Sequence, residues 1–523
     1  MTKTIIIGAG SGGGVLASRL SESPEEEVVL IEAGPDYPDG AAIPDDIRDA
    51  REMSVSEHDW GLKAYFIEPP EAREAMPYPR GRVVGGSSSV NAAIAVHGAR
   101  EDFDTWVEAG NPEWSYEKTR PYFVKLENDQ DFGDRPGHGS DGPITIKRHF
   151  EEDWSAGTRA LVEALVERGF PRVEDFNADS VSGVGPTPRN LEGPEELRAG
   201  SLITYLAEAR KRPNLTIKAD TLARRVLFEG KRAVGVEVEH NGEIEEIYAD
   251  RVVLCGGAMH TPHLLMLSGI GPEEVLKKFD IEPVHINEAV GKNFQDHPFA
   301  PFVVLLSEPT DKIGVRAMCS YNTSTGNLFN DMMTFGAVLD PATMNIPAET
   351  KGKKALMMNN LLAKPRSVGW ITLSSGDPHI QPELHVNFLS HPSDMERLKE
   401  AVRFCWELAN SSPLREEIDE ICFLDEDTIR DDEKLEAYIR GMSSTSLHAA
   451  GTARMGPAGD EQAVVDQYLN VHGVDGLYVA DASVMVNVTT GLTNTTSYMI
   501  GERLAEWLLD PSKVEQAKAE VTA

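Results

Sequence analysis

The chain has 523 residues, of which 41% are hydrophobic, and its formal net charge at pH 7 is −35. This acidity argues against nucleic acid or an anionic membrane as a partner, because both would repel the protein. No stretch reaches the roughly 18 apolar residues of a membrane span, and the first expected strand begins too early for a signal peptide, so we expect a cytoplasmic α/β protein.

Hydrophobic periodicity predicts helices and strands along the whole chain. Helices are expected at 12–22, 155–168, 197–211, 258–268, 393–411 and 496–509, and strands at 3–8, 27–32, 233–239, 251–255 and 477–480. Buried strands at the start, the middle and the end run into small or acidic residues, which predicts one domain assembled from distant segments. The stretches between them would form a second domain. The tail after Pro511 is expected to be a solvated helix or a frayed end.

The first strand and the first helix are joined by a glycine-rich turn. Gly8 permits a tight turn, Gly10 lets the backbone approach a pyrophosphate, and Gly13 lets the helix pack against the strand. The helix N-terminus supplies partial positive charge, and Glu32 stands where a carboxylate would accept hydrogen bonds from ribose hydroxyls. Such turns also occur as plain loops, but strand, turn, helix and acid in this order predict a nucleotide cofactor.

Five motifs make the chain resemble the glucose-methanol-choline (GMC) oxidoreductases. They are 8–13 with Glu32, 81–91, 261–262 with 267–272, 290–298, and 447–456 followed by 479–485. The likeness covers the whole chain in the family's order. The pattern is most similar to bacterial members of the choline oxidase and hydroxymethylfurfural oxidase type.

The resemblance implies FAD as the cofactor and the oxidation of alcohols. It also implies a Rossmann-like FAD-binding domain assembled from discontinuous segments, and a substrate domain whose antiparallel sheet, flanked by helices, roofs the flavin ring. We assign 1–150, 193–298 and 443–523 to the FAD-binding domain, and 151–192 and 299–442 to the substrate domain.

Several residues match the family's cofactor-binding positions. They are Gly8, Gly10, Ser11, Gly13, Glu32, Ala33, Gly86, Ser87, Asn91, Val226, Asp481, Ala482 and Thr495. Members that bind flavin covalently have a histidine where this chain has Val90. The FAD is therefore expected to be held noncovalently.

His448 matches the family's catalytic histidine. Moving a hydride from an alcohol carbon to flavin N5 requires the hydroxyl proton to leave, and a base with a pKa near neutrality suits this step. Members normally carry a second catalytic histidine or asparagine, and counting from Met485 puts Leu492 at that position, with Asn494 two residues later. Either a local shift makes Asn494 catalytic, or His448 works beside an apolar neighbour and Asn494 contacts the flavin.

The remaining histidines and the cysteines are expected to be structural. His297 falls in a family motif and is interpreted as holding the junction between the domains, and His97 and His472 are interpreted as scaffold residues. The four cysteines are widely separated without a CxxC pair, which predicts reduced thiols. No metal is expected. Thr334 stands where several relatives have an additional active-site histidine.

The substrate side of the motifs is apolar. Choline-type relatives have an aromatic residue before the catalytic histidine and a glutamate after the Asp-His-Pro motif, where this chain has Leu447 and Phe299. A quaternary ammonium would call for an aromatic cage and a carboxylate, so a neutral alcohol, aromatic or aliphatic, is favoured. Met332 and Met485 are interpreted as core residues rather than pocket residues.

The sequence leaves the substrate, the electron acceptor and two alternative functions open. No motif specifies the substrate, the oligomeric state, or whether electrons pass to oxygen or to another acceptor. The apolar Leu492 also leaves room for a lyase or other non-redox enzyme that keeps FAD as a structural element. A flavoprotein without enzymatic activity is a third possibility, against which the preserved loop of His448 argues.

Overall fold

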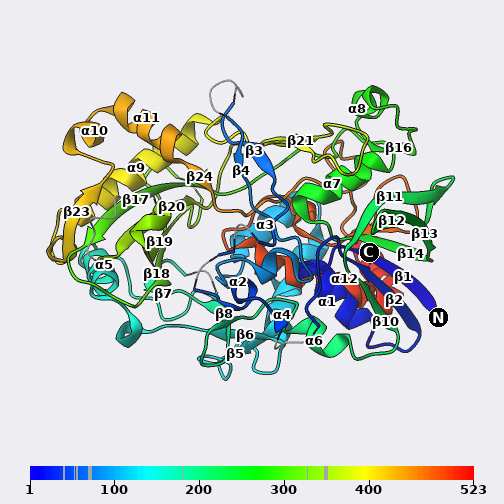
Figure 1. Ribbon diagram of the computed structural model, residues 1–523, viewed down its shortest axis with the longest axis horizontal. Coiled ribbons are helices and arrows are strands. Elements are labelled where there is room, and N and C mark those ends of the chain that lie inside the picture. The colour runs from blue at the N-terminus through cyan, green and yellow to red at the C-terminus, as the bar shows by residue number, and fades with distance from the viewer. Residues whose placement is uncertain are drawn as a thin grey trace.

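The computed structural model describes residues 1–38, 42–51, 53–54, 57–68, 74–179, 181–326, 328–344, 346 and 352–522. Two large sheets lie toward opposite ends of the molecule, and the rest of the chain packs between and around them (Figure 1). One sheet is parallel and the other antiparallel. The predicted fold class, an α/β chain with a Rossmann-like part built from distant segments and an antiparallel sheet flanked by helices, is confirmed.

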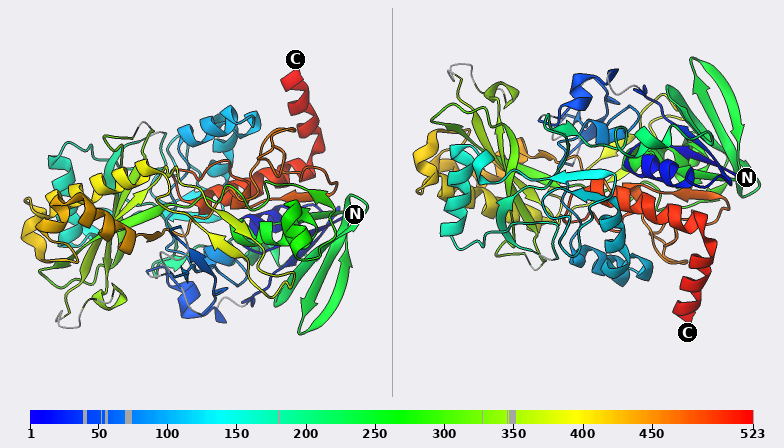
Figure 2. Two further views of the ribbon diagram at one scale, coloured as in Figure 1. Left: turned by 90° about the horizontal axis from the view of Figure 1, so that it is seen from above. Right: turned by 90° about the horizontal axis from the view of Figure 1, so that it is seen from below.

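The parallel sheet combines strands from three distant parts of the chain. It has the order β10-β2-β1-β14-β25, with β1 at Thr2–Ile7, β2 at Glu26–Ile31, β10 at Leu215–Lys218, β14 at Arg251–Leu254 and β25 at Leu477–Val479. Helices α1 (Ser11–Leu20) and α12 (Thr493–Leu509) lie together on one side, and a hairpin sheet, β11-β12-β13, lies on the other (Figure 2). Because both faces are covered, the central stretches Ile5–Ile7, Val28–Ile31 and Val252–Leu254 are continuous apolar runs.

The antiparallel sheet has a helix-covered face and a face that turns toward the centre of the molecule. Its order is β23-β17-β20-β19-β18-β7, and β24 (Ser444–Thr445) pairs with β17. The bounds are β7 Gly183–Pro186, β17 Pro298–Leu306, β18 Gly314–Tyr321, β19 Met332–Leu339, β20 Ala355–Leu362 and β23 Ile418–Cys422. Helices α5 (Ala156–Glu167) and α9 (Pro392–Ala409) pack on the outer face. The domain boundaries given above stay a prediction.

The remaining helices and strands connect these two layers. They are α2 Asp45–Arg48, β3 Lys63–Tyr65, β4 Met76–Pro77, α3 Arg100–Glu108, α4 Tyr116–Leu126, β5 Glu127–Asp129, β6 Ile144–Lys147, β8 Arg189–Glu192, β9 Leu197–Arg198, α6 Tyr205–Ala209, β11 Thr221–Glu229, β12 Arg232–His240, β13 Glu243–Tyr248, α7 Gly257–Leu267, β15 Ile270–Gly271, α8 Glu273–Lys278, β16 His285–Ile286, β21 Trp370–Thr372, β22 Glu383–His385, α10 Glu426–Arg430, α11 Asp432–Met442 and α13 Pro511–Thr522.

The prediction of a helix at 197–211 is wrong for most of these residues, since only Tyr205–Ala209 is helical. The preceding residues are taken up by tertiary contacts. Arg198 is buried and donates to carbonyl oxygens that include those of Asn91 and Ser89. A Cβ at Gly200 would lie 2.3 Å from the carbonyl oxygen of Ser88. These contacts override the local helical pattern. The other expected helices and strands are present, and none of their ends is shifted by more than three residues.

Two general expectations are also met. All four cysteines are free and buried. Among the described residues, no helix combines the length and the apolar character needed to cross a membrane. The tail after Pro511 forms α13, which projects from the body of the protein (Figure 2).

Candidate functional site

A cavity of about 890 Å³ runs between the two sheets. At one end its wall is formed by the glycine-rich turn after β1 and by Glu32 at the end of β2. At the other end it is formed by the inner face of β17, β19 and β20. His448 lies in the wall between these ends. The cavity therefore joins the predicted cofactor segments to the predicted substrate sheet.

At the cofactor end the backbone segments approach too closely to admit side chains. Gly8 has a φ of +100°, and a Cβ at Gly13 would lie 1.9 Å from the carbonyl oxygen of Gly8. A Cβ at Gly86 would lie 2.7 Å from the Cα of Gly10. Helix α1 begins at Ser11 without a side-chain cap, so its first N–H groups are available to an anion.

Two buried carboxylates tie the strand ends to neighbouring backbone at this end of the cavity. Glu32 accepts from the N–H groups of Ala9 and Gly34, each at 3.0 Å, and burial raises its pKa to about 7. Asp481, which follows β25, accepts from the Gly257 N–H at 2.8 Å and from the Thr261 hydroxyl at 2.6 Å. Its pKa is raised by burial.

Most of the residues assigned to the cofactor line the cavity. These are Gly8, Gly10, Ser11, Glu32, Ala33, Gly86, Ser87, Asn91, Asp481 and Ala482. Gly13, Val226 and Thr495 are buried outside the described wall. The Val226 N–H donates to Ser268 at 2.8 Å, and the Thr495 hydroxyl donates to the Val96 carbonyl at 3.1 Å. Cofactor contacts by these three residues stay a prediction.

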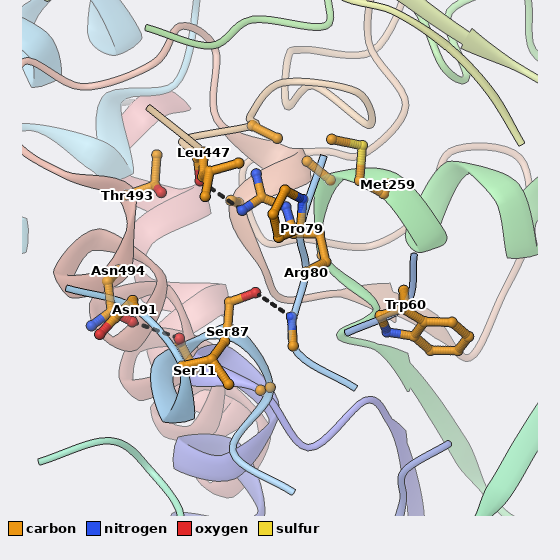
Figure 3. A pocket seen from close by; sticks show the side chains of 18 of the residues that line it. Ser11, Trp60, Pro79, Arg80, Ser87, Asn91, Met259, Leu447, Thr493 and Asn494 are labelled. Carbon is orange, nitrogen blue, oxygen red and sulfur yellow. Dashed lines mark hydrogen bonds between the residues drawn. The ribbon is translucent and has the colours of Figure 1, made fainter. Parts of the chain in front are cut away.

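Asn494 and Leu492 are directed to different parts of the cavity. Asn494 Oδ1 accepts a hydrogen bond of 2.7 Å from the Ser11 hydroxyl, at the start of α1 (Figure 3). Its Nδ2 is buried and has no partner among the described residues. Leu492 instead packs in an apolar cluster with Phe335 and Leu361 of the antiparallel sheet. Asn494 therefore belongs to the glycine-turn end, and Leu492 to the sheet end.

His448 lies in a loop whose backbone is held from several directions. Leu447, directly before it, has a φ of 64°, a conformation that costs a non-glycine residue about 1–3 kcal/mol. The Leu447 carbonyl accepts from Arg80 Nη1 at 2.7 Å (Figure 3). The Leu447 N–H donates to the Thr445 hydroxyl at 2.7 Å. The His448 N–H donates to Asp296 Oδ1 at 2.8 Å. The surrounding structure thus fixes the backbone on both sides of the imidazole.

The ring of His448 contacts a second histidine. The Nδ1 atoms of His297 and His448 lie 3.0 Å apart, and the rings meet edge to face with their centroids 5.1 Å apart. The other ring nitrogen of His448, Nε2, has no hydrogen-bond partner among the described residues. The sequence interpretation gave His297 only a structural role, and its contact with the ring of His448 was missed. The sequence identified the motif that contains His297. It could not predict the contact with His448, because the two residues are 151 positions apart in the chain.

Positive charge and burial keep both rings neutral. The pKa of His448 is lowered well below its ordinary value by burial and then by His297 and Arg80. The pKa of His297 is lowered to about 3 by burial and then by Lys364, while the carbonyl groups of Ala363 and Thr489 oppose this shift. Both imidazoles are therefore unprotonated at neutral pH, and each carries one N–H.

An ion pair behind His297 joins two distant segments. Lys364, which follows β20, pairs with Asp102 of α3, and both are buried. Asp102 also accepts from the N–H of Thr490 at 2.8 Å and from its hydroxyl at 2.9 Å. This pair holds together the segments whose carbonyl groups, at Ala363 and Thr489, act on His297.

The sheet end of the cavity is mainly apolar. Phe299, Phe335, Leu361, Leu447 and Leu492 all line it. The carboxylates of the described wall, Glu32 and Asp481, lie at the opposite end. Thr334 does not line the described cavity and donates to Asn360 at 2.9 Å on the buried side of the sheet. Met332 and Met485 are buried in the two hydrophobic cores.

The glycine-turn end fits an FAD molecule by the chemistry of its wall. An uncapped helix N-terminus faces a backbone cradle without side chains, and the unpartnered Nδ2 of Asn494 lies beside it. These groups are donors for a pyrophosphate and for the polar edge of a ring. Val90 lines the same cavity, as expected for a noncovalently held cofactor.

Comparisons with known proteins agree with this geometry. The GMC oxidoreductase family models match residues 2–299 with the N-terminal part and 365–501 with the C-terminal part. The chain is 35% identical to 5-(hydroxymethyl)furfural oxidase of Methylovorus sp., over 97% of this chain and 99% of that protein. It is 34% identical to oxygen-dependent choline dehydrogenase 1 of Chromohalobacter salexigens, over 98% and 96%. Its structure is similar to that of pyridoxine 4-oxidase from Mesorbium loti, with a TM-score of 0.88, 28% identity, and coverage of 97% and 99%.

Proposed function

The chain belongs to the GMC oxidoreductases, an FAD-carrying family, and on this premise we propose that it oxidises a neutral primary alcohol, aromatic or aliphatic, to the carbonyl compound. The observation that carries the proposal is the placement of His448. Its imidazole is neutral, it lines the cavity, and its Nε2 has no partner among the described residues.

His448 is the proposed base. When FAD is bound, its flavin ring supplies the acceptor for the hydride that leaves the alcohol carbon. In the same reaction Nε2 of His448 takes the hydroxyl proton, so the alcohol loses a hydride and a proton in total. Because Nδ1 of His448 faces Nδ1 of His297, we assign the His448 proton to Nδ1 and leave the Nε2 lone pair toward the cavity.

His297 and Asp296 orient this base. In the proposed arrangement, His297 accepts at Nδ1 and carries its own proton on Nε2, toward the carbonyl groups of Ala363 and Thr489. Asp296 accepts the N–H groups of both His297 and His448, at 2.7 and 2.8 Å. Asp296 thereby fixes the two backbones without placing a negative charge on either ring.

The second catalytic position is proposed to be the apolar Leu492, with Asn494 acting on the cofactor. The hydrogen bond of Asn494 to Ser11 at the start of α1 supports this choice. In this assignment Asn494 contacts the cofactor and is not a second acid or base. In this arrangement His448 binds the reacting oxygen of the alcohol.

A neutral alcohol is favoured over a quaternary ammonium. No carboxylate of the described wall lies at the sheet end, where Phe299 and Leu447 stand instead. Without a nearby carboxylate, a cation would lose its hydration there with little compensation. The relatives named as a hydroxymethylfurfural oxidase and a pyridoxine oxidase support a neutral substrate, and "oxidase" and "oxygen-dependent" in the printed names support oxygen as the electron acceptor.

The test is a panel of primary alcohols mixed anaerobically with the FAD-loaded protein. We expect one or more of them to bleach the flavin absorbance, and oxygen then to restore it with release of hydrogen peroxide. Turnover without any flavin bleaching would support the alternative, a lyase-type enzyme that retains FAD structurally. Peroxide-free reoxidation by an added dye would point to another electron acceptor.

A further inference from the structure

Among the described residues of strands β17, β18, β19 and β20, Asn359 is the polar residue that lines the cavity. Side chains alternate along a strand, so Met357, Asn359 and Leu361 of β20 all face the cavity. Leu361 is paired with Phe299, and β24, which leads into the loop of His448, pairs with β17 at Phe299. Asn359 lies two residues beyond Leu361 along β20, and is therefore about 7 Å farther from that loop than Leu361 is.

The amide of Asn359 has no hydrogen-bond partner among the described residues. Its Oδ1 is buried and accepts no hydrogen bond, and no described residue donates to or accepts from its side chain. A buried polar group without a hydrogen bond is unfavourable, so such a group calls for an explanation. The neighbours of Asn359 on this face, Phe335 and Leu361, offer only carbon atoms from their side chains.

The next residue, Asn360, is also an asparagine, but both polar atoms of its side chain are hydrogen bonded within the protein, as expected for a structural role. Its Oδ1 accepts from the Thr334 hydroxyl at 2.9 Å and from the Cys405 thiol at 3.2 Å. Its Nδ2 donates to the Ala300 carbonyl at 3.2 Å. Asn360 is fully buried on the outer face of the sheet. The contrast indicates that the partner of Asn359 comes from outside the protein.

We propose that Asn359 determines substrate specificity by binding a second hydroxyl group of the alcohol, at the end of its apolar body remote from the reacting carbon. A hydroxyl is the group that can both donate to Oδ1 and accept from Nδ2. Asn359 lies about 7 Å along β20 beyond Leu361, the residue of β20 that pairs with Phe299 beside β24, so we expect the body of the alcohol to be about the size of one aromatic ring. The inference rests on the proposed alcohol oxidation and narrows it to diols of this shape.

The test compares 1,4-benzenedimethanol with 4-ethylbenzyl alcohol, which replaces the second hydroxyl by a methyl group and keeps the size. In the FAD-loaded protein we expect kcat/KM to be at least tenfold higher for the diol, after correction for its two reactive ends. Asn359→Leu should abolish this preference by lowering kcat/KM for the diol, with little change for the ethyl compound. Met357→Leu, on the same face of β20 but one row farther out, should change both substrates by the same factor.

Binding gives a readout that does not depend on turnover. In a His448→Ala background, flavin difference spectra report the dissociation constants of both alcohols. Adding Asn359→Leu should weaken the diol at least tenfold and leave the ethyl compound unchanged. Equal binding of the two alcohols to the protein with Asn359 intact would overturn the inference, as would equal losses for both in Asn359→Leu. Failure of every alcohol to bleach the flavin would overturn the proposed function instead, and the binding ratio would still decide the role of Asn359.

Discussion

Two buried groups of histidines in this molecule have their pKa values moved in opposite directions. At the site, His448 faces His297 and Arg80, and its pKa is lowered well below 6.5. Behind β5 and β6, His138 hydrogen bonds to carboxylates, and its pKa is raised to about 11. Since burial lowers the pKa in both cases, the difference comes from the sign of the neighbouring charges.

Carboxylates lie close to both ring nitrogens of His138. Its Nδ1 lies 3.3 Å from Asp129 and 3.4 Å from Glu127, and its Nε2 lies 2.9 Å from Asp175. Arg148 donates to Asp129 and Asp175 as well, and His97 lies 3.1 Å from Glu127. His138 is therefore a structural cation, whereas His448 keeps a neutral ring with one nitrogen facing the cavity.

The same cluster has the spacing of a metal site, although no metal was expected from the sequence. Ligand atoms of Glu127, Asp129 and His138 lie within 4.8 Å of one another. The guanidinium of Arg148 already neutralises Asp129. We therefore interpret the cluster as an ion network in which the proton of His138 takes the place that a metal would need.

The largest expected effect is on catalysis. His448→Ala removes the proposed base, so the rate of flavin reduction by a good alcohol substrate should fall about 10²- to 10⁴-fold. The measurement is anaerobic stopped-flow at saturating alcohol, with FAD content determined for each variant. His138→Gln is the matched comparison and should reduce the flavin at the wild-type rate under conditions where it is folded. A His448→Ala protein within threefold of wild type would remove His448 from its role.

The next effect is on stability. His138→Gln removes the cation that Glu127, Asp129 and Asp175 share, and leaves Arg148 beside the two aspartates and His97 beside Glu127. We expect a loss of about 3–5 kcal/mol in the free energy of unfolding. The exposed His379→Gln should change this free energy by no more than about 0.5 kcal/mol. Thermal or denaturant unfolding of the FAD-loaded proteins provides the comparison.

The stability loss should depend on pH with a defined sign. The folded-state pKa of His138 is about 11 against 6.5 for an ordinary histidine, so its contribution is complete below pH 6.5. It is lost as the pH rises toward 11, because the folded state then holds a proton that the unfolded state has released. The gap between wild type and His138→Gln should narrow from pH 6 to pH 10. A constant gap over this range would show that His138 is not charged in the folded protein.

The sequence predicted the parts of the fold and site that depend on local patterns. The turn from Gly8 to Gly13, the buried strands and the amphipathic helices α5, α9 and α12 each follow from residues close together in the chain. The segment at 197–211 was mispredicted, because Arg198 and Gly200 are fixed by contacts with residues more than 100 positions away. Periodicity carries no information about such contacts.

The site could be predicted only in outline for the same reason. Motifs identified His448, but its partner His297 and the buried pair of Lys364 with Asp102 come together only in the fold. Asn359 could not be distinguished from Asn360 in the sequence, since the two differ only in which face of β20 they occupy. Hydrogen-bond satisfaction separates them, and it requires coordinates.

The smallest expected effect is on the pH dependence of kcat/KM, and it tests how charge controls the two histidine groups. If positive charge keeps the His297 ring neutral, removing the charge of Lys364 should raise the pKa of His297. A protonated His297 would donate from Nδ1 to His448 Nδ1 and so place the proton of His448 on Nε2, where the ring could no longer act as the base. The acid limb of kcat/KM should therefore move to higher pH in Lys364→Met, by roughly one pH unit or less.

Two variants separate this charge effect from damage to the ion pair. Lys364→Arg keeps the positive charge and should leave the acid limb where it is in wild type. Asp102→Asn breaks the same pair but leaves the lysine charged, so the limb should not move upward. If Asp102→Asn and Lys364→Met shifted the limb upward equally, the pair would act only by holding the carbonyl groups beside His297. A shift in Lys364→Met alone would instead show that the positive charge of Lys364 helps to keep the site histidines neutral, as the negative charges around His138 keep that residue protonated.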